Sequence, residues 1–420
     1  FPAASHSQLS LIGWGSNQVW DQSALGSWGE SICFEPGQAQ GRATITDVRP
    51  LLVRSIGIPR EYHWTANVGG GDFFRFHDLA GTRIPHSGMR ADYRRVGPCL
   101  TEVTYAGTIG ETGIQHQETV SLGRTDDLVT GTYRIRMEVS KLVSFSRFVL
   151  FQIGADSYST TREKKLAVGQ GEDLIMEWDA RWGGDEDKGE ALECRTLPAW
   201  ASLHETLGNP HRPTEGAWAN KGFIIREWRA KLGGQEALPW MQERGLGKEG
   251  KKQTSSLNLV PPPSVKQLLP GDFVEATIEH VVIPQFAKDY YGPNASLRQA
   301  LQNHENTWRM MSRQAVGDQI KVRMRKGSLR WNYPDVRVVV SEEEVELTLE
   351  GGLGLVPVTI EGLSSHQGYV LRLNEGKVDQ AVHGKDYWQT EFDPLNGTWS
   401  QTYNVPIPEG ESVRLRFGRR

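Results

Sequence analysis

The chain has 420 residues, 38% of them hydrophobic and 23% charged, a composition that can bury enough apolar surface to fold and that excludes general disorder. Its 47 Lys and Arg residues are nearly balanced by 51 Asp and Glu residues, and the formal net charge of −4 argues against a protein that works by neutralising phosphates. No segment approaches the roughly 18 apolar residues that a membrane-spanning helix needs. We therefore expect neither a nucleic-acid partner nor a membrane span.

The sequence begins with Phe1 rather than Met, which indicates that a preceding segment was removed, either by a signal peptidase or by the choice of boundaries. We expect a secreted or periplasmic protein. Cys33, Cys99 and Cys194 permit at most one disulfide, so the fold does not depend on a disulfide framework. The 46 glycines and 21 prolines indicate many tight turns, and therefore many short strands.

The first hundred residues combine weak periodicity with many glycines and with Trp14, Trp20, Trp28 and Trp64. Loops of this composition usually bind a ligand, although tryptophans can equally plug the open end of a β core. Because aromatic planes suit the apolar faces of pyranose rings, the cluster favours a sugar ligand.

A glycine run at residues 69–71 follows His63, Trp64 and Asn67 and precedes Asp72. Three glycines let the backbone approach a ligand closely. We take Trp64, Asn67 and Asp72 as candidate substrate-binding residues and His63 as a candidate catalytic residue. The spacing is not that of a phosphate-binding loop. The alternative is a strained turn in which Asp72 caps local amides.

Residues 83–95 gather four arginines with His86 and Tyr93. Arg90 and Arg94 can hold a sugar carboxylate or sulfate, while His86 or Tyr93 can act as base or acid. These are the requirements for β-elimination of a uronic acid. A neutralised carboxylate makes the C5 proton acidic, a base removes that proton, and an acid protonates the leaving oxygen. The alternative is a solvated basic loop.

Alternation of apolar and polar residues dominates from about residue 100 to 283. It predicts strands at 129–139, 143–153, 174–182, 222–230 and 273–283. His116, Glu118 and His280 interrupt apolar rows. We take His116 as a candidate catalytic residue and Glu118 and His280 as candidate binding residues, although a histidine in such a row is more often a hydrogen-bonded core residue.

Charged residues on the predicted strands offer a second chemistry. Glu177 and Asp179 on one strand, with Glu227 on another, can supply the paired carboxylates of a glycosidase, or can simply cover a solvated sheet face. The sequence lacks Gly-x-Ser-x-Gly, His-Glu-x-x-His and Cys-x-x-Cys motifs, which disfavours serine hydrolases, zinc proteases and thioredoxins. No histidine has a recognised metal-ligand spacing, and we expect no metal and no cofactor.

Helical spacing of apolar residues predicts one long helix over residues 296–316, with Ser296 and Gln299 as its capping box and Gly317 as its stop. Short alternating segments beyond Gly317 predict a small β-sandwich.

These elements indicate two domains. Residues 1–316 are expected to form a large β domain with Trp- and Gly-rich N-terminal loops and a terminal helix, and residues 317–420 the small C-terminal sandwich.

Four segments, residues 105–108 (YAGT), 118–127 (ETVSLGRTDD), 133–139 (YRIRMEV) and 148–158 (FVLFQIGADSY), resemble the long-stranded core of galactose-mutarotase-like supersandwiches. That superfamily includes sugar epimerases, glycosidase domains and polysaccharide lyases. The resemblance covers roughly residues 100–283 and implies a concave sheet that carries a glycan groove. For mutarotase activity it implies a histidine pair and a carboxylate base, parts that His116, His280 and Glu118 can be given.

The expected fold is thus mostly β, a large antiparallel β-supersandwich with one long helix and a small C-terminal β-sandwich. We expect a secreted carbohydrate-active enzyme that cleaves an acidic, uronate-containing polysaccharide by β-elimination, with a polysaccharide or oligosaccharide as its partner. The alternatives are a glycoside hydrolase that uses paired carboxylates and a non-catalytic carbohydrate-binding protein.

Overall fold

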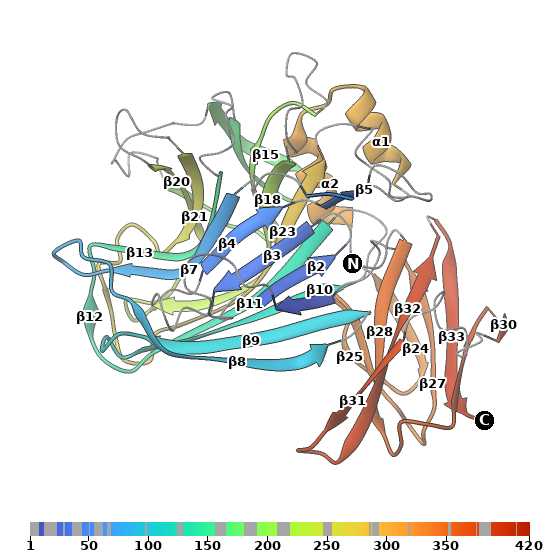
Figure 1. Ribbon diagram of the computed structural model, residues 1–420. Helices are drawn as coiled ribbons and strands as arrows, with labels where there is room; N and C mark the ends of the chain where they lie inside the picture. Colours follow the sequence, from blue (N-terminus) through green and yellow to red (C-terminus); the bar gives the residue numbers. More distant parts are fainter. Residues whose placement is uncertain are drawn as a thin grey trace.

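The structure is a computed structural model of the chain (Figure 1). It describes residues 69–96, 99–123, 129–155, 165–179, 191–207, 219–246, 254–284, 287, 294–317, 320–351, 354–374, 376–377, 388–408 and 410–420, and the course of six short strands before residue 69. Among the described residues, no helix is long and apolar enough to cross a bilayer.

Two large antiparallel sheets form the first part of the molecule. The nine-stranded sheet has the order β1 (Gln8–Leu11), β2 (Ser23–Ser27), β3 (Glu30–Glu35), β4 (Thr44–Arg49), β7 (Gly69–His77), β13 (Arg147–Ala155), β21 (Thr254–Val260), β20 (Trp240–Leu246) and β16 (Leu192–Glu193). The ten-stranded sheet has the order β15 (Asp173–Asp179), β14 (Lys165–Gln170), β17 (Ala199–His204), β18 (Ala219–Leu232), β23 (Phe273–Pro284), β11 (Val129–Val139), β10 (Ile114–Gly123), β9 (Leu100–Ile109) and β8 (His86–Val96), with β19 (Gln235–Glu236) paired to β18. Two short ribbons, β5 (Leu51–Val53) with β6 (Tyr62–Trp64) and β12 (Val143–Ser144) with β22 (Gln267–Leu268), complete this part.

One hydrophobic core lies between the two large sheets. On β11, Tyr133, Ile135 and Met137 are at most 2% exposed and face this core, while the intervening Arg134 and Arg136 face away from it. Strand residues alternate between the two faces of a sheet, so the sequence alternation decides which side is buried. The structure confirms the expected mostly β fold with large antiparallel sheets packed face to face.

The last hundred residues form a second, smaller sandwich. One five-stranded sheet has the order β24 (Lys321–Lys326), β27 (Val345–Glu350), β33 (Ser412–Arg419), β29 (Tyr369–Leu373) and β30 (Gly376–Lys377). The other has the order β25 (Ser328–Trp331), β26 (Val336–Val339), β28 (Gly354–Leu363), β32 (Thr398–Ile407) and β31 (Trp388–Asp393), in which β26 and β28 are parallel. A separate hydrophobic core fills this sandwich, and for that reason we propose a domain boundary near residue 317.

The helical segment differs from the expected single helix. Two helices, α1 (Ala295–Gln302) and α2 (Thr307–Gly317), are separated by a short turn in which His304 has a φ of 55°. A left-handed residue such as His304 cannot continue a right-handed helix, so the helix is interrupted there. The apolar residues keep a helical spacing on both sides of the break, and the sequence pattern therefore did not indicate it. The N-cap is Asn294, whose side chain accepts a hydrogen bond from Leu297 N at 2.8 Å, and not Ser296. Both helices pack on the ten-stranded sheet around Trp200 and Ile224.

One strand prediction and one alternative interpretation need correction, and a second strand prediction is confirmed over its described residues. The segment 143–153 is split into β12 and β13, because Phe145 and Ser146 lie outside both strands. The segment 174–182 is β15, an edge strand whose apolar residues are largely exposed, and its last three residues lie outside the described residues. Residues 83–95 are not a loop, because most of them belong to β8.

The small sandwich packs on the end of the ten-stranded sheet through buried polar contacts. Gln389 on β31 accepts hydrogen bonds from the backbone N–H groups of Cys99 and Leu100, at 2.9 and 3.0 Å, and donates to the carbonyl of Leu100 at 2.9 Å. Arg95 on β8 pairs with Glu361 at 3.1 Å. These contacts fix the sheet β25-β26-β28-β32-β31 against β8 and β9, so the sheet that contains β33 faces away (Figure 1).

Candidate functional site

The outer face of the ten-stranded sheet, the face turned away from the nine-stranded sheet, carries three rows of aligned side chains across β8, β9, β10, β11, β23 and β18. Row 1 consists of Arg90, Ala106, Gln117, Arg136, Glu275 and Arg229. Row 2 consists of Asp92, Thr104, Thr119, Arg134, Thr277 and Glu227. Row 3 consists of Arg95, Glu102, Ser121, Thr132, Glu279 and Ile224. With neighbouring strands about 4.8 Å apart, each row is about 24 Å long.

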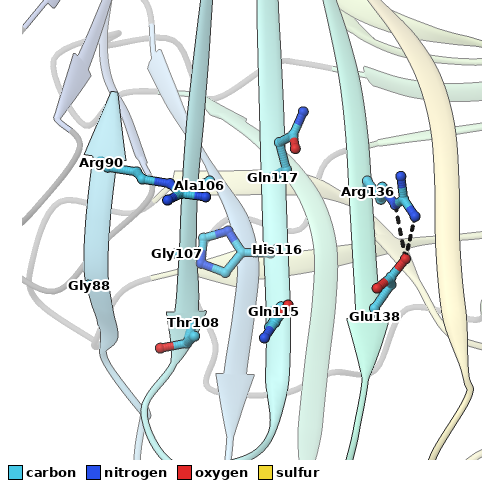
Figure 2. A pocket seen from close by; sticks show the side chains of 10 residues that line it. All are labelled: Gly88, Arg90, Ala106, Gly107, Thr108, Gln115, His116, Gln117, Arg136 and Glu138. Atoms are coloured by element: carbon cyan, nitrogen blue, oxygen red, sulfur yellow. Dashed lines mark hydrogen bonds and ion pairs between the residues drawn. The ribbon is translucent and has the colours of Figure 1, made fainter. Parts of the chain in front are cut away.

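A continuous groove follows rows 1 and 2. A cavity of about 360 Å³ is lined by Arg90, Gly88, Ala106, Gly107, Thr108, Gln115, His116, Gln117, Arg136 and Glu138 (Figure 2). A second cavity of about 590 Å³ is lined by residues of both rows, by Arg94 and by Trp331 of the small sandwich. The two cavities share Gln117 and Arg136, so they form one open groove. Most of the residues that line it have charged, amide or hydroxyl side chains.

The groove is cationic at the β8 end. Arg90, which extends from β8 across Ala106 in Figure 2, forms no ion pair with any described residue. Arg136 is bound to Glu138, with Nε 3.1 Å from Oε1, and Arg229 is bound to Glu275, with Nε 3.0 Å from Oε2. Along the whole groove five arginines face three glutamates: Arg90, Arg94, Arg134, Arg136 and Arg229 against Glu138, Glu227 and Glu275.

Two features distinguish the β18 end of the groove. Glu227 is exposed and accepts a hydrogen bond from the Thr277 hydroxyl at 2.7 Å, and it forms no ion pair with any described residue. The guanidinium group of Arg134 lies 5.2 Å from the centre of the Trp331 ring, a cation–π contact that joins the sheet to the small sandwich. This end therefore places an unpaired carboxylate near an arginine and an aromatic wall.

Row 3 is covered by the small sandwich and anchors the groove. Glu102, 3% exposed, accepts hydrogen bonds from Ser121 at 3.0 Å and from Arg134 and Arg337 at 2.8 Å each. Burial alone raises the pKa of Glu102, but the positive charges of Arg337 and Arg134 outweigh it and lower the pKa to about 2. Glu102 therefore remains ionised and holds Arg134 in place above Trp331.

A buried histidine pair lies on the other side of the same strands. His116 Nδ1 is 2.6 Å from Glu118 Oε1, and His116 Nε2 is 2.9 Å from His86 Nδ1. His86 Nε2 is in turn 3.2 Å from the carbonyl oxygen of Phe74. Phe74 has a φ of 47° and takes no part in the pairing of β7 with β13, which leaves its carbonyl free for this bond.

Burial lowers the pKa of His86 to about 3, helped by the neighbouring His116 and Arg83, so His86 is neutral. A neutral His86 that donates from Nε2 to Phe74 must accept at Nδ1, and the proton on the His86–His116 bond then belongs to His116 Nε2. The side chains of His116 and Glu118 are 0% exposed, although His116 lines the smaller cavity from beneath Gly107, which has no side chain to cover it. This arrangement is typical of a hydrogen-bonded core.

The expected catalytic strip is divided between the two faces of the sheet. His86 is 4% exposed and points inward, whereas Arg90 and Arg94 are exposed on the outer face. Alternation alone would place His86 and Arg90 on the same face of β8, and the register shift between Ser87 and Arg90 puts them on opposite faces. The structure therefore does not bring His86 and Arg90 to one surface. The backbone of Tyr93 is paired with Val103, but its side chain lies outside the described residues.

The glycine-run candidates also have new positions. Gly69–Gly71 and Asp72 belong to strand β7, so the run is not a turn. The carboxylate of Asp72 pairs with Arg75 at 3.3 Å and with Arg83 at 3.1 Å, and none of the described backbone amides donates to it. The side chains of His63 and Trp64, on β6, and the whole of Asn67 lie outside the described residues.

The remaining candidates lie apart from the groove. His280 is 1% exposed and points into the core, where its Nδ1 is 3.3 Å from the hydroxyl group of Tyr133. Burial lowers its pKa to about 3, so it is neutral. Glu177 on β15 is bound to His204, 3.1 Å from Nε2, and β15 is three strands away from the β18 strand of Glu227. Glu177 and Glu227 are therefore not brought together as a pair.

Arg134, Arg136 and Trp331, which line the groove, are not among the site residues expected from the sequence. The alternation at residues 129–139 already placed Arg134 and Arg136 on one polar face. Nothing in the sequence indicated that Trp331, almost two hundred residues later, lies over that face.

No family model matches the chain, and no curated protein matches it. Among solved structures, it is similar to the galactosidase domain of an α-galactosidase–sucrose kinase, with 8% identity and a TM-score of 0.37 over 64% of this chain and 41% of that one. It is similar to a putative aldose 1-epimerase from Klebsiella pneumoniae, with 9% identity and a TM-score of 0.36 over 71% of this chain and 88% of that one. It is also similar to a galactose mutarotase related enzyme from Lactobacillus acidophilus, with 9% identity and a TM-score of 0.33 over 63% and 98%. These matches have TM-scores below 0.5, so what the chain binds or does has to be argued from its own residues.

Proposed function

We propose that this chain binds an acidic polysaccharide along rows 1 and 2 of the groove and cleaves it by β-elimination at a uronate residue. The observation that carries the proposal is the continuity of the two cavities through Gln117 and Arg136 along a floor that carries five arginines. An open groove about 24 Å long accommodates several linked sugars, whereas a deep closed pocket would select a single small molecule.

The floor of the groove supports an acidic ligand. Arginine holds carboxylates and sulfates through planar, two-pronged hydrogen bonds. Arg90 is available for such a bond because it has no ion-pair partner among the described residues, and Arg94 has only the exposed Asp92, with Nε 3.1 Å from Oδ2. Gln115, Gln117 and the row 2 threonines add donors and acceptors that suit sugar hydroxyl groups.

The β18 end of the groove supports the chemistry. There Arg134 and Arg229 can neutralise the uronate carboxylate, and Glu227 can accept the C5 proton. The electrons of the C5–H bond then form the C4–C5 double bond, and the C4–O bond breaks. The proton returns from the Glu227 carboxyl group to the leaving oxygen, so no co-reactant is needed. Glu227 takes the role of base because His86 is buried away from the groove.

Hydrolysis by paired carboxylates is the second candidate, favoured by one observation. Glu275 lies diagonally across from Glu227 on the neighbouring strand, and diagonal neighbours in a sheet are about 7–8 Å apart. Carboxyl groups that keep this spacing of their strand positions fall within the roughly 6.5–9.5 Å separation of inverting glycosidases.

One incubation separates these functions. The protein is mixed with a uronate polysaccharide, and the ultraviolet absorbance of unsaturated uronates and the number of reducing ends are followed together. Elimination raises both signals, hydrolysis raises the reducing ends alone, and a binding-only protein raises neither. We expect Glu227→Gln to abolish the unsaturated product while binding persists, and Glu236→Gln, an exposed carboxylate outside the groove, to change nothing. Full elimination by Glu227→Gln would overturn the assignment of the base.

A further inference from the structure

A second cationic surface lies on the small sandwich, on the outer face of the sheet β24-β27-β33-β29. Seven cationic side chains and four carboxylates of the described residues lie on this face or at its edge: Lys321, Arg323, Arg325, Lys326, Arg372, Arg414 and Arg416, with Glu342, Glu344, Glu346 and Glu350. The alternating Val and Leu residues of the same strands fill the core of the sandwich, so alternation alone directs the charged residues outward. An excess of positive charge here contrasts with the net charge of −4 of the whole chain.

One carboxylate in the middle of this face is shared by three arginines. Glu346 Oε1 lies 3.0 Å from Arg414 Nε, 3.5 Å from Arg416 Nε and 3.5 Å from Arg325 Nη1. The hydrogen bond from Arg414 lowers the pKa of Glu346, which keeps it ionised. A single negative charge cannot neutralise three positive charges, so this cluster retains positive charge that faces solvent.

The remaining cations extend the cluster into two rows. In the strand register, Arg416 lies opposite Arg372 on β29 and opposite Glu346 on β27. Arg414 lies opposite Thr348 on β27, and Thr348 lies opposite Arg323 on β24. Arg372 is exposed and forms no ion pair with any described residue. From β24 to β29 the face spans three strand spacings, about 14 Å. The rows therefore present several cations at regular intervals to an extended ligand.

The face differs from the groove in kind and position. Among its described residues there is no outward aromatic side chain, since Tyr369 and Phe417 are 2% and 3% exposed and belong to the core. It therefore offers neither a stacking surface for sugars or bases nor a carboxylate free for proton transfer. It lies on the side of the small sandwich turned away from the ten-stranded sheet, as the position of β33 in Figure 1 shows.

We propose that this face is an accessory binding surface for the same acidic polysaccharide, which it recognises by charge and holds outside the groove. The proposal rests on the proposed function for the identity of the polymer. Two sites on one molecule raise the apparent affinity for a long polymer without new contacts in the groove, because the second binding step becomes intramolecular. A short oligosaccharide cannot engage both sites and gains nothing.

The test compares a long polyuronate with a short oligouronate that fills the groove alone, by titration calorimetry on the full chain. We expect the Arg372→Glu/Arg416→Glu variant to weaken polymer binding by about tenfold or more. Binding and cleavage of the oligomer are expected to be unchanged. The control variant Arg195→Glu/Arg309→Glu makes the same change in net charge at exposed arginines elsewhere and is expected to match the wild type.

The outcomes separate the two proposals. If the Arg372→Glu/Arg416→Glu variant and the control variant bind the polymer with equal affinity, the accessory site is overturned, independently of whether the groove binds the oligomer. If the oligomer fails to bind while polymer binding still depends on Arg372 and Arg416, the proposed function of the groove fails and the face survives. If a DNA duplex of the same charge binds this face as tightly as the polyuronate, the assignment to a polysaccharide is overturned. The milder variant Arg372→Gln/Arg416→Gln serves if charge reversal impairs folding.

Discussion

The buried carboxylate of Glu102 provides a prediction whose magnitude follows from the structure. Burial raises its pKa, but the charges of Arg337 and Arg134 outweigh burial and move the pKa from an ordinary 4.5 to about 2. This difference corresponds to about 3 kcal/mol of folding free energy. Because the folded-state pKa is the lower one, the contribution is complete above pH 4.5 and is lost as the pH falls from about 4.5 to about 2.

The substitution Glu102→Gln removes this titration and leaves Arg134 without its carboxylate. We expect the free energy of unfolding at pH 6, measured by urea denaturation, to fall by about 3 kcal/mol. Between pH 6 and pH 2 the variant should lose about 3 kcal/mol less than the wild type, because the group responsible no longer titrates.

A matched control is Glu350→Gln, which breaks an ion pair with Arg323 whose side chains are 30% and 72% exposed. Exposed pairs contribute at most about 1 kcal/mol, so the control should stay close to the wild type at both pH values. A Glu102→Gln variant that keeps the full acid sensitivity of the wild type would refute the reasoning, because another group would then cause it.

Two further predictions concern the layer beneath the groove. Gly107→Ala places a Cβ 2.4 Å from Met89 Sδ and 3.3 Å from His116 Nε2. We expect thermal unfolding to show that this variant loses about 1–3 kcal/mol of folding free energy. The control Gly317→Ala, with no atom within 4 Å of its Cβ, should lose almost none. His116→Gln leaves either Glu118 or His86 without its partner, and we expect a loss of about 1–3 kcal/mol in urea denaturation with oligouronate affinity kept. If His116→Gln abolished cleavage in a fully folded protein, a catalytic role for the pair would replace this structural one.

The β architecture could be predicted from the sequence because the alternation of apolar and polar residues shows which face of each strand is buried. The rows on β11 and β23 and in the small sandwich could be assigned from residue spacing, and the structure confirms them. The break between α1 and α2 could not, since the apolar period continues on both sides of His304. A backbone conformation at one residue leaves no periodic signal.

The groove was harder to predict than the fold for a different reason. Its rows exist only after β8, β11 and β18 are placed in register, and these strands are far apart in the sequence. Arg90 was recognised as an anion-binding candidate from its neighbours. The sequence alone could not show that His86 and Arg90 face opposite sides of the sheet, because the register shift between Ser87 and Arg90 arises only when β8 pairs with β9.

The central claim is that the carboxylates of a polysaccharide bind the arginines of rows 1 and 2. The most direct measurement compares the affinities of the wild type and the Arg90→Ala/Arg136→Ala variant for an oligouronate and for the same oligosaccharide after its carboxyl groups are reduced to alcohols. We predict that the variant binds the oligouronate at least about tenfold more weakly, and that both proteins bind the reduced sugar equally. Equal affinity of the two proteins for the oligouronate would contradict the account.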